Sequence, residues 1–534
     1  MNIALCQINT ILGNFTYNRS KILKYCNDAK IKNADIVVFP ELSISGYPPQ
    51  DLIFQNEFIK QNLEELDIIS KKSTIPLIIG YIRKDGNKTY NSAAVCYSGK
   101  IQSFYDKILL PTYDVFDERR YFTSGDRTSL TVISYNGKKL KIGLQICEDM
   151  WDSQYTCKVS KEQMEKGAEL IINISASPYQ KDRLIQRKSI IREKVMQTKL
   201  PIFYCNTVGA QDELIFDGQS LAFSNDGKVI GYANAFKEEL IIVNSNSKTE
   251  INIKKESMEE KTYNALCLGV KDYFIKTGHK EALIGLSGGI DSSLVASIAT
   301  DALGSKNVHG ISLPSKYSSK HSLDDAKLLA DNLGIDYKVI PINSIVGEME
   351  SILDPYFHKL ASDVTEENIQ ARVRGNILMA LSNKFNWLVL STGNKTELAL
   401  GYCTLYGDMS GGLSVISDLN KMDVYGLCNW LNTKYDNRIP KNIIIKPPSA
   451  ELSFNQVDPF DYSIVSPLVE LIVEKGISKN KLVKSGVDKD LVDSVHNRIR
   501  LNEFKRRQSA PCLRISSKSF GVGRRFPIVN HFQG

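Results

Sequence analysis

EALIGLSGGIDSSLVASIATDAL, residues 281–303, joins an apolar run to a helical pattern through a turn rich in serine and glycine. EALIGL predicts a buried strand, SGGI a tight loop and DSSLVASIATDAL a helix. Because a strand followed at once by a helix opens a β-α-β unit, this stretch favours a parallel sheet.

The same alternation continues along the second half of the chain. NVHGISLP (307–314) and DYKVIPI (336–342) predict strands. SLDDAKLLADNLG (322–334), between them, predicts a helix that ends at a glycine C-cap. Strand–helix–strand units of this length predict a doubly wound parallel sheet.

The first half repeats short apolar runs separated by amphipathic segments such as residues 181–199. The predicted strands there are 34–42, 76–82, 141–147, 169–175 and 201–208. This pattern indicates a layered α/β domain. A polar, weakly periodic stretch, 244–260, predicts a linker, so we expect domains at 1–243 and 261–534.

Composition is that of a globular protein in a reducing compartment. The 534 residues are 42% hydrophobic and 24% charged, and no apolar run reaches the length of a membrane span. The ten cysteines form no CxxC pair and the start MNIALCQINTILGNF has no basic leader, which favours the cytoplasm over secretion, disulfides or zinc. A net charge of +7 is mild and fits a small anionic substrate as well as nucleic acid.

LSGGIDSS, residues 286–293, has the features of a phosphate-binding turn. Its glycines let the backbone approach an anion, and the amides at the start of the following helix face that anion. Ser287, Ser292 and Ser293 add hydroxyl donors, and Asp291 can hold a cation. No lysine follows the glycines, so it is not a Walker A loop. The alternative is a structural glycine turn capped by serine.

Four later stretches carry polar residues at predicted element ends. The helix 366–385 puts Asn368 and Arg372 on one face, beside an apolar stripe of Ile369, Val373, Ile377, Ala380 and Leu381. Thr392 and Glu397 lie where the strand of 387–408 breaks into a turn. KPPSAEL (446–452) is a stiff loop and FKRRQ (504–508) a basic cluster. Taken singly, each is equally explained as solvated surface, a capping acid or an exposed charge run.

SGGIDSS resembles the pyrophosphate-binding loop of the N-type ATP pyrophosphatases, which split ATP between its α- and β-phosphates and adenylate an acyl group. With the four later stretches, residues 260–534 resemble the NAD synthetase family. The resemblance implies ATP contacts from Leu286, Ser287, Gly288, Gly289, Ile290, Asp291, Ser292, Ser293, Thr392 and Lys421. It implies contacts to deamido-NAD from Asn368, Glu397, Asp408 and Lys505, and Mg²⁺ held by Asp291 and Glu397.

KIGLQICEDMW (141–151) ends a predicted strand at Cys147, yet the first histidine of the chain is His279. A nucleophilic thiol here would need another base. FPEL, YDKILLPTYDVFDE and CEDMW supply Glu41, Lys107 and Cys147 at strand ends, and they resemble the triad of the nitrilase-type amidohydrolases, in the branch fused to NAD synthetases. Each residue alone has a structural alternative: a buried thiol, a capping acid or an exposed lysine.

This second resemblance covers about residues 1–240 and implies an α-β-β-α sandwich. Glu41 would accept the thiol proton, Lys107 would stabilise the thiolate and the oxyanion, and Cys147 would carry a γ-glutamyl thioester. Tyr113, Ser175 and Lys181 would bind glutamine. The role of Glu148, next to the thiol, stays open.

Together the resemblances imply a homo-oligomeric ligase that makes NAD from deamido-NAD, ATP and ammonia. The ammonia would be released from glutamine and passed through an internal channel. They imply neither a nucleic-acid nor a membrane partner. One rival is another amidating or thiolating member of the superfamily, acting on GMP or tRNA. The other is an inactive nucleotide-binding scaffold. A tRNA enzyme would need a larger basic module than FKRRQ and VGRRF (522–526) provide.

Overall fold

The computed structural model describes residues 1–135, 138–358 and 360–532. The chain divides into two compact units, Met1–Lys255 and Glu256–Gly534. The division falls inside the polar stretch 244–260. Within the described ranges, no helix is both long and apolar enough to cross a bilayer.

Unit 1 contains two six-stranded sheets of the same design. In each, parallel central strands are flanked by antiparallel ones. The first sheet has the order β14 (Glu239–Asn244), β1 (Asn2–Gln7), β2 (Ile36–Val38), β3 (Leu77–Asp85), β4 (Lys88–Tyr97) and β5 (Lys100–Asp106). The second has the order β13 (Val229–Tyr232), β12 (Leu221–Phe223), β9 (Ile202–Asn206), β8 (Leu170–Ser175), β7 (Lys138–Ile146) and β6 (Leu130–Tyr135).

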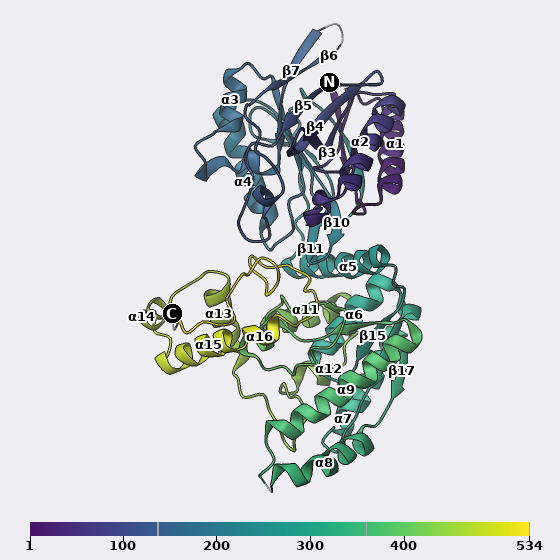
Figure 1. The fold of residues 1–534 in the computed structure, drawn as a ribbon, viewed down its shortest axis with the longest axis vertical. Helices are drawn as coiled ribbons and strands as arrows, with labels where there is room; N and C mark the ends of the chain where they lie inside the picture. Colours follow the sequence, from purple (N-terminus) through teal and green to yellow (C-terminus); the bar gives the residue numbers. More distant parts are fainter. Residues whose placement is uncertain (136–137, 359, 533–534) are drawn as a thin grey trace. The chain divides into compact units, whose positions relative to one another are not determined.

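The two sheets face each other, and helices cover their outer faces. Inward side chains of β1, β2 and β4 share one apolar cluster with those of β7, β8 and β9. Helices α1 (Phe15–Ile31) and α2 (Asn56–Lys72) lie on one side of unit 1, and α3 (Val159–Glu165) and α4 (Arg183–Thr198) on the other (Figure 1). The expected α-β-β-α sandwich is therefore confirmed. A short hairpin, β10 (Val208–Gln211) and β11 (Leu214–Asp217), completes the unit.

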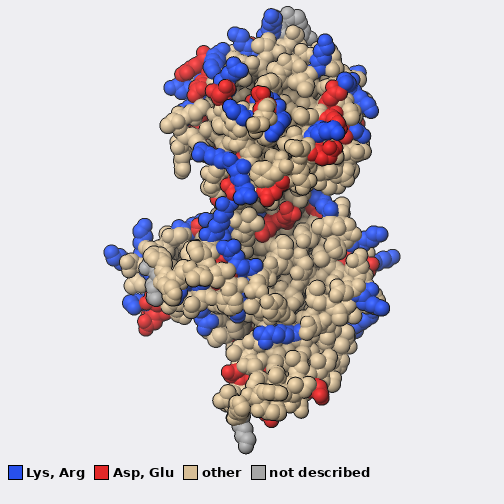
Figure 2. Space-filling view, in the orientation of Figure 1, with Lys and Arg blue, Asp and Glu red and all other residues tan. Residues whose placement is uncertain are grey.

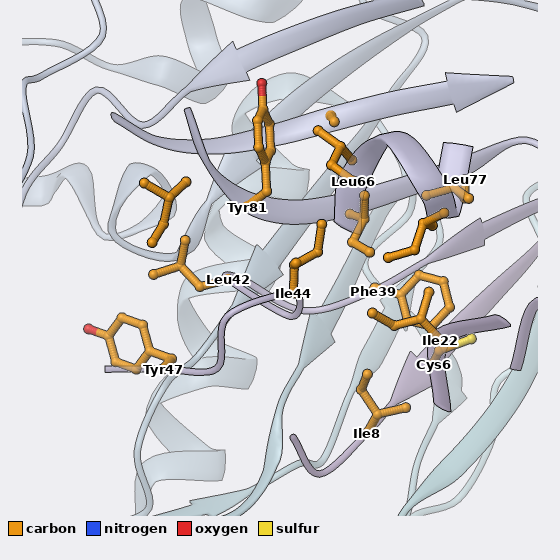
Figure 3. Packing of buried hydrophobic residues seen from close by; sticks show 14 of the residues in the cluster. Cys6, Ile8, Ile22, Phe39, Leu42, Ile44, Tyr47, Leu66, Leu77 and Tyr81 are labelled. Atoms are coloured by element: carbon orange, nitrogen blue, oxygen red, sulfur yellow. The ribbon is translucent and has the colours of Figure 1, made fainter. Parts of the chain in front are cut away.

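The loop after β2 is anchored in the cluster beneath α1 and α2. Figure 3 shows Leu42, Ile44 and Tyr47, from this loop, among the side chains of that cluster. Glu41 directly precedes Leu42, so apolar packing fixes the segment that carries this carboxylate.

Unit 2 is built on a five-stranded sheet whose strand pairs are all parallel. Its order is β17 (Asp336–Val339), β16 (Val308–Ser312), β15 (Ala282–Gly285), β18 (Leu388–Ser391) and β19 (Leu413–Ser414). The chain winds outward in both directions from β15, so the predicted doubly wound sheet is confirmed. Ligands of such folds bind where the strand order reverses, here between the ends of β15 and β18.

Local signals explain where the helices of unit 2 begin and end. Ser319 caps α7 (Lys320–Leu333), which ends at Gly334 with a positive φ, as predicted. Asp363 and Glu366 form a capping box at the start of α9 (Val364–Phe385). The other helices of the unit are α5 (Met258–Thr277), α6 (Ile290–Leu303), α8 (Asn343–Phe357), α10 (Lys395–Leu400), α11 (Lys421–Lys434), α12 (Lys441–Ile445), α13 (Tyr462–Val473), α14 (Lys479–Lys484), α15 (Lys489–Leu501) and α16 (Glu503–Arg506).

Candidate active sites

Cys147 lies at a sharp turn directly after β7, where the chain enters a 3₁₀ turn, Cys147–Met150. Its φ is +44°, a left-handed conformation that few residues other than glycine adopt. The side chain is buried, and Asn173 donates a hydrogen bond of 3.4 Å to its backbone carbonyl. Strained residues of this kind concentrate at functional sites, which favours an active over a purely structural thiol.

The ammonium of Lys107 lies between two buried carboxylates. Its Nζ donates to Glu41 at 2.7 Å and to Glu118 at 2.8 Å. Glu41 also accepts hydrogen bonds from the Asn91 amide at 2.7 Å and from the backbone N–H of Ala176 at 2.9 Å. These bonds hold Glu41 and Lys107 in one arrangement.

Electrostatics keep the thiol protonated in the resting site. Burial raises the pKa of Cys147, Glu41 raises it further, and the Lys107 ammonium opposes both. Glu41 and Lys107, which bind each other, therefore both lie close enough to act on the charge of the Cys147 thiol. A thiol with a raised pKa attacks only if a neighbouring base removes its proton.

Glu118 belongs to this site, but the motifs did not single it out. Burial raises its pKa to about 7, while Lys107 lowers it, and the Tyr47 hydroxyl donates to it at 3.0 Å. It lies eleven residues after Lys107, inside the motif quoted for that lysine. Only the spatial arrangement shows that both acids share one ammonium.

Gly80 of β3 makes room for the loop that carries Glu41. A Cβ at this position would lie 2.2 Å from the Leu42 nitrogen and 2.6 Å from the Pro40 carbonyl oxygen. Because both atoms belong to the backbone, a side chain would push the whole loop away.

The residues expected to bind glutamine lie in different surroundings. The Tyr113 hydroxyl donates to both oxygens of Glu148, at 3.1 and 3.0 Å, and Tyr155 donates to the same carboxylate at 3.0 Å. Ser175 is fully buried and donates to Asn173 at 2.7 Å, whereas Lys181 is partly exposed just before α4. Tyr113 and Glu148 therefore lie near the thiol, and Ser175 binds Asn173, which holds the Cys147 carbonyl.

In unit 2 a large cavity opens at the switch point of the sheet. The sequence-predicted residues that line it are Leu286, Ser287, Gly289, Ile290, Asp291, Ser292, Thr392, Glu397, Asp408 and Lys421. Gly288, Ser293, Asn368 and Lys505 are not among the lining residues. The SGGIDSS turn thus faces a cavity.

Gly288 allows this turn to lie against the start of α7. Its φ is +72°, and a Cβ would lie 2.2 Å from the Ser322 carbonyl oxygen. Two serines of the turn are committed within it: Ser287 Oγ accepts from the Gly289 N–H at 3.1 Å, and Ser293 Oγ donates to the Gly289 carbonyl at 2.7 Å. The turn is therefore held in shape before any ligand binds.

Lys421 lies between two carboxylates, as Lys107 does in unit 1. Its Nζ is 2.5 Å from Asp291 and 3.1 Å from Glu397. Asn394, the cap of α10, donates to Asp291 at 3.0 Å. Burial raises the pKa of Glu397 to about 7, with Lys421 lowering it and Asp291 raising it. Glu397 belongs to the capping box of α10 and also lines the cavity.

Three residues expected to contact the dinucleotide converge on the turn 401–404. Asn368 accepts from the Thr404 hydroxyl at 2.6 Å, and Asp408 accepts from the Thr404 N–H at 2.7 Å. Lys505 donates to the carbonyls of Gly401 and Cys403 at 2.8 and 2.7 Å.

Full-length comparison with known proteins decides the family. The chain is 41% identical to the glutamine-dependent NAD(+) synthetase of Synechocystis sp. (strain ATCC 27184 / PCC 6803 / Kazusa), over 99% of each chain. It is 40% identical to the protein of that name from Thermotoga maritima, over 100% of this chain and 99% of the relative. The chain belongs to the glutamine-dependent NAD(+) synthetase family.

Both units of this family member also match by themselves. The carbon-nitrogen hydrolase family model matches residues 2–255 and the NAD synthase model matches residues 262–509. The solved glutamine-dependent NAD+ synthetase of Acinetobacter baumannii, in complex with ADP, is 36% identical with a TM-score of 0.80, over 99% of this chain and 98% of that one. The synthetase of Cytophaga hutchinsonii, 22% identical over 99% and 98%, has the same fold with a TM-score of 0.85.

Arg374 is a cavity residue that the sequence did not identify. The helical pattern singled out Arg372 because it shares a face with Asn368, but Arg372 donates to the Leu405 carbonyl at 3.3 Å. Arg374 lines the cavity, donates from Nε to the Leu313 carbonyl at 2.9 Å, and has its pKa lowered to about 10 by burial. The spacing of charged residues on α9 could not show which arginine faces the cavity.

The loop 446–452 contributes a further acid to the cavity wall. Glu451 lines the cavity and accepts from the hydroxyls of Ser319 and Ser322, at 3.1 and 2.5 Å. Lys446 donates to Ser322 at 2.8 Å. These contacts tie KPPSAEL to the start of α7, which the sequence did not predict.

Proposed function

We propose that the chain hydrolyses glutamine in unit 1 and uses the ammonia in unit 2 to convert deamido-NAD into NAD with consumption of ATP. The observation that carries this is that one chain holds a Cys147 turn next to Lys107 and Glu41, and an SGGIDSS turn that lines a cavity. Full-length relatives at about 40% identity bear the name of this activity.

The glutaminase half-reaction uses the three groups around Cys147. As the thiol attacks the glutamine side-chain amide, Glu41 accepts its proton and Lys107 stabilises the thiolate and then the tetrahedral oxyanion. Glu41 then gives this proton to the leaving nitrogen, so collapse releases ammonia and leaves a γ-glutamyl thioester on Cys147. Glu41, again a carboxylate, deprotonates the water that attacks the thioester, glutamate leaves, and the proton returns to the Cys147 sulfur. Tyr113, Ser175 and Lys181 form the glutamine subsite in this proposal.

The synthetase half-reaction activates a carboxylate that is a poor electrophile. The nicotinate carboxylate of deamido-NAD attacks the α-phosphorus of ATP, pyrophosphate leaves, and ammonia displaces AMP from the acyl-adenylate. In the proposal the turn 286–293, Thr392 and Lys421 bind ATP. Asn368, Glu397, Asp408 and Lys505 bind the deamido-NAD.

Magnesium fits the acidic pair in this cavity. Asp291 and Glu397 approach one ammonium from two sides, and carboxylate oxygens are the donors that Mg²⁺ prefers. In the proposal these two residues hold the ion, which neutralises charge on the departing pyrophosphate when bound. Lys421 then holds the same phosphates as a point charge.

Three wider features complete the proposal. Residues 1–243 are the glutaminase domain, 244–260 the linker and 261–534 the synthetase domain, with ammonia passing between them inside a homo-oligomer. The ten cysteines form no disulfide among the described residues, which fits a cytoplasmic protein. Figure 2 shows Lys and Arg interspersed with acidic and neutral residues on the visible face of each unit, which suits small substrates better than nucleic acid.

A product assay tests the function. With ATP, Mg²⁺, glutamine and deamido-NAD, we expect NAD, AMP and glutamate to form together. The Cys147→Ala variant should lose glutamine use and keep NAD formation from added ammonium at alkaline pH. Cys26→Ala, which removes a buried thiol of α1, is the matched control and should keep both activities. If neither nitrogen source gives NAD with the wild type, the proposed function is wrong.

A further inference from the structure

Asp149 is a fully buried carboxylate that the glutaminase chemistry above leaves without a role. It accepts hydrogen bonds from the backbone N–H groups of Ile146 at 2.9 Å, Leu109 at 2.9 Å and Ile108 at 3.2 Å. The Tyr105 hydroxyl donates to it at 2.9 Å. A carboxylate that accepts so many bonds inside a protein holds its neighbours in place.

These donors come from two segments that meet only in the folded unit. Ile146 immediately precedes Cys147, whereas Ile108 and Leu109 immediately follow Lys107. One carboxylate therefore ties the chain beside the thiol to the chain beside the ammonium. The bond from Ile146 alone is the usual contact of an acid in a first helical turn, but the bonds from Ile108 and Leu109 go beyond capping.

The turn at Cys147 needs such support because it is strained. A φ of +44° in a residue with a side chain costs about 1–2 kcal/mol and persists only where the surroundings enforce it. Asp149 holds the N–H of Ile146, the residue before Cys147, and Asn173 holds the carbonyl of Cys147 itself. The nucleophile is thus restrained on both sides.

The ionisation of Asp149 suits this task. Burial raises its pKa to about 6, while the N–H groups of Ile146 and Leu109, Lys107 and the Tyr105 hydroxyl lower it. The group is therefore ionised at neutral pH and can accept bonds through both oxygens.

We propose that Asp149 is a positioning residue of the glutaminase site, which sets the distance between the Cys147 thiol and the Lys107 ammonium by binding the backbone next to each of them. The proposal rests on the proposed function of unit 1. Asp149 acts through the peptide groups of Ile146, Ile108 and Leu109, which take no part in the chemistry themselves.

Asp149→Asn in the full chain is the main test. The amide has the size of the carboxylate but replaces one acceptor oxygen with an NH₂ group that faces a backbone donor. We expect kcat for glutamine-dependent NAD formation to fall about 100-fold, the loss typical of a small misplacement of a reacting group. KM for glutamine and NAD formation from ammonium should stay near the wild-type values. If the wild type makes NAD from glutamine and Asp149→Asn has the same kcat, the inference is wrong and the proposed function still stands.

A second readout separates positioning from a general loss of stability. The rate at which iodoacetamide alkylates Cys147 is measured against pH by peptide mass spectrometry, with the partly exposed Cys267 of unit 2 as the internal reference. The charged groups that act most strongly on Cys147 are Glu41, Lys107, Glu148 and Glu118, and of these only Lys107 favours the thiolate. The Arg187 guanidinium also favours it, and the hydroxyls of Tyr47, Tyr113 and Tyr204 interact with the same thiol. A misplaced ammonium should shift the Cys147 profile to higher pH. An unmoved profile overturns the inference.

Asp152→Asn is the matched control. Asp152 is equally buried and near in sequence, but it pairs with Lys194 at 2.5 Å. We expect a lower melting temperature with an unchanged alkylation profile. If Asp149→Asn does not fold, Tyr105→Phe removes one donor from the same carboxylate. Its Cys147 profile should shift in the same direction by less, and a wild-type profile overturns the inference.

Discussion

At the scale of single residues, both sites use the same charge arrangement. A buried lysine lies between two carboxylates: Lys107 between Glu41 and Glu118, and Lys421 between Asp291 and Glu397. In each trio burial raises the pKa of one acid to about 7. A single ammonium cannot compensate two desolvated anions, so one proton is held weakly near neutral pH.

Lys107→Met should strongly destabilise unit 1. Removing one partner of a buried ion pair leaves uncompensated charge, which costs about 3–5 kcal/mol. Calorimetry at neutral pH is the measurement, and the loss should shrink in acid as the carboxylates become protonated. Lys60→Met is the control, since Lys60 is exposed and its acidic partners are 3.7 and 3.9 Å away. Equal effects of the two variants would contradict the prediction.

Glu397→Gln should change how the stability of unit 2 depends on pH. An acid with a folded-state pKa of about 7, above its ordinary 4.5, binds a proton in the folded state that it releases on unfolding. Its contribution is therefore present at acid pH and lost as pH rises from about 4.5 to about 7. The Glu397→Gln variant does not lose stability in this way. Its melting temperature relative to the wild type should therefore increase between pH 5 and pH 8.

The control for this prediction is Glu348→Gln on α8. The Glu348 side chain is exposed, so its melting temperature relative to the wild type should change little with pH. A Glu397→Gln difference that is equally independent of pH would show that burial does not govern this carboxylate.

At the scale of elements, glycines decide how closely loops approach the sites. Gly80 lets the loop with Glu41 cross β3, and Gly288 lets the SGGIDSS turn touch the start of α7. In both places the nearest atoms belong to the backbone and cannot move aside alone.

Gly288→Ala should abolish ATP-dependent NAD formation from either nitrogen source while glutamine hydrolysis continues. The added Cβ would displace either the turn or α7, because 2.2 Å to a carbonyl oxygen is far inside van der Waals contact. Gly476→Ala is the matched control: its φ of +61° carries the same backbone strain, but no atom lies within 4 Å of the added carbon. We expect that variant to lose about 1–2 kcal/mol of stability and no activity. Similar activity losses in both variants would contradict the steric explanation.

At the scale of the whole molecule, the two activities belong to separate compact units of one chain. Each unit has its own sheets and its own apolar clusters. Substitutions at one site are therefore expected to leave the fold of the other unit intact.

Mixing two single-site variants tests whether ammonia passes internally. Cys147→Ala keeps the synthetase site and Gly288→Ala keeps the glutaminase site. If ammonia stays inside the molecule, the mixture should form little NAD from glutamine at neutral pH, where ammonia released into water becomes ammonium. Added ammonium at alkaline pH should restore NAD formation by the Cys147→Ala chain. A mixture as active as the wild type would show transfer through the solvent.

The sequence alone determined several of the elements and the local motifs. Apolar periodicity predicted β7, β8, β15, α7 and α9, because side-chain burial follows the spacing of residues along one element. The short motifs indicated Glu41, Lys107, Cys147 and the 286–293 turn for a similar reason: their chemistry depends on neighbours within a few residues.

The tertiary structure decided which side chains from distant segments share one environment. It placed Glu118 beside Lys107, Lys421 between two acids, and Arg374 rather than Arg372 in the cavity wall. It also placed Asp149 where it accepts hydrogen bonds from the segment beside Lys107 and from the segment beside Cys147. Periodicity fixes the face of an element on which a residue lies. The packing of sheets and helices fixes which other residues that face contacts. The pKa shifts and the shared hydrogen bonds arise from these contacts between elements.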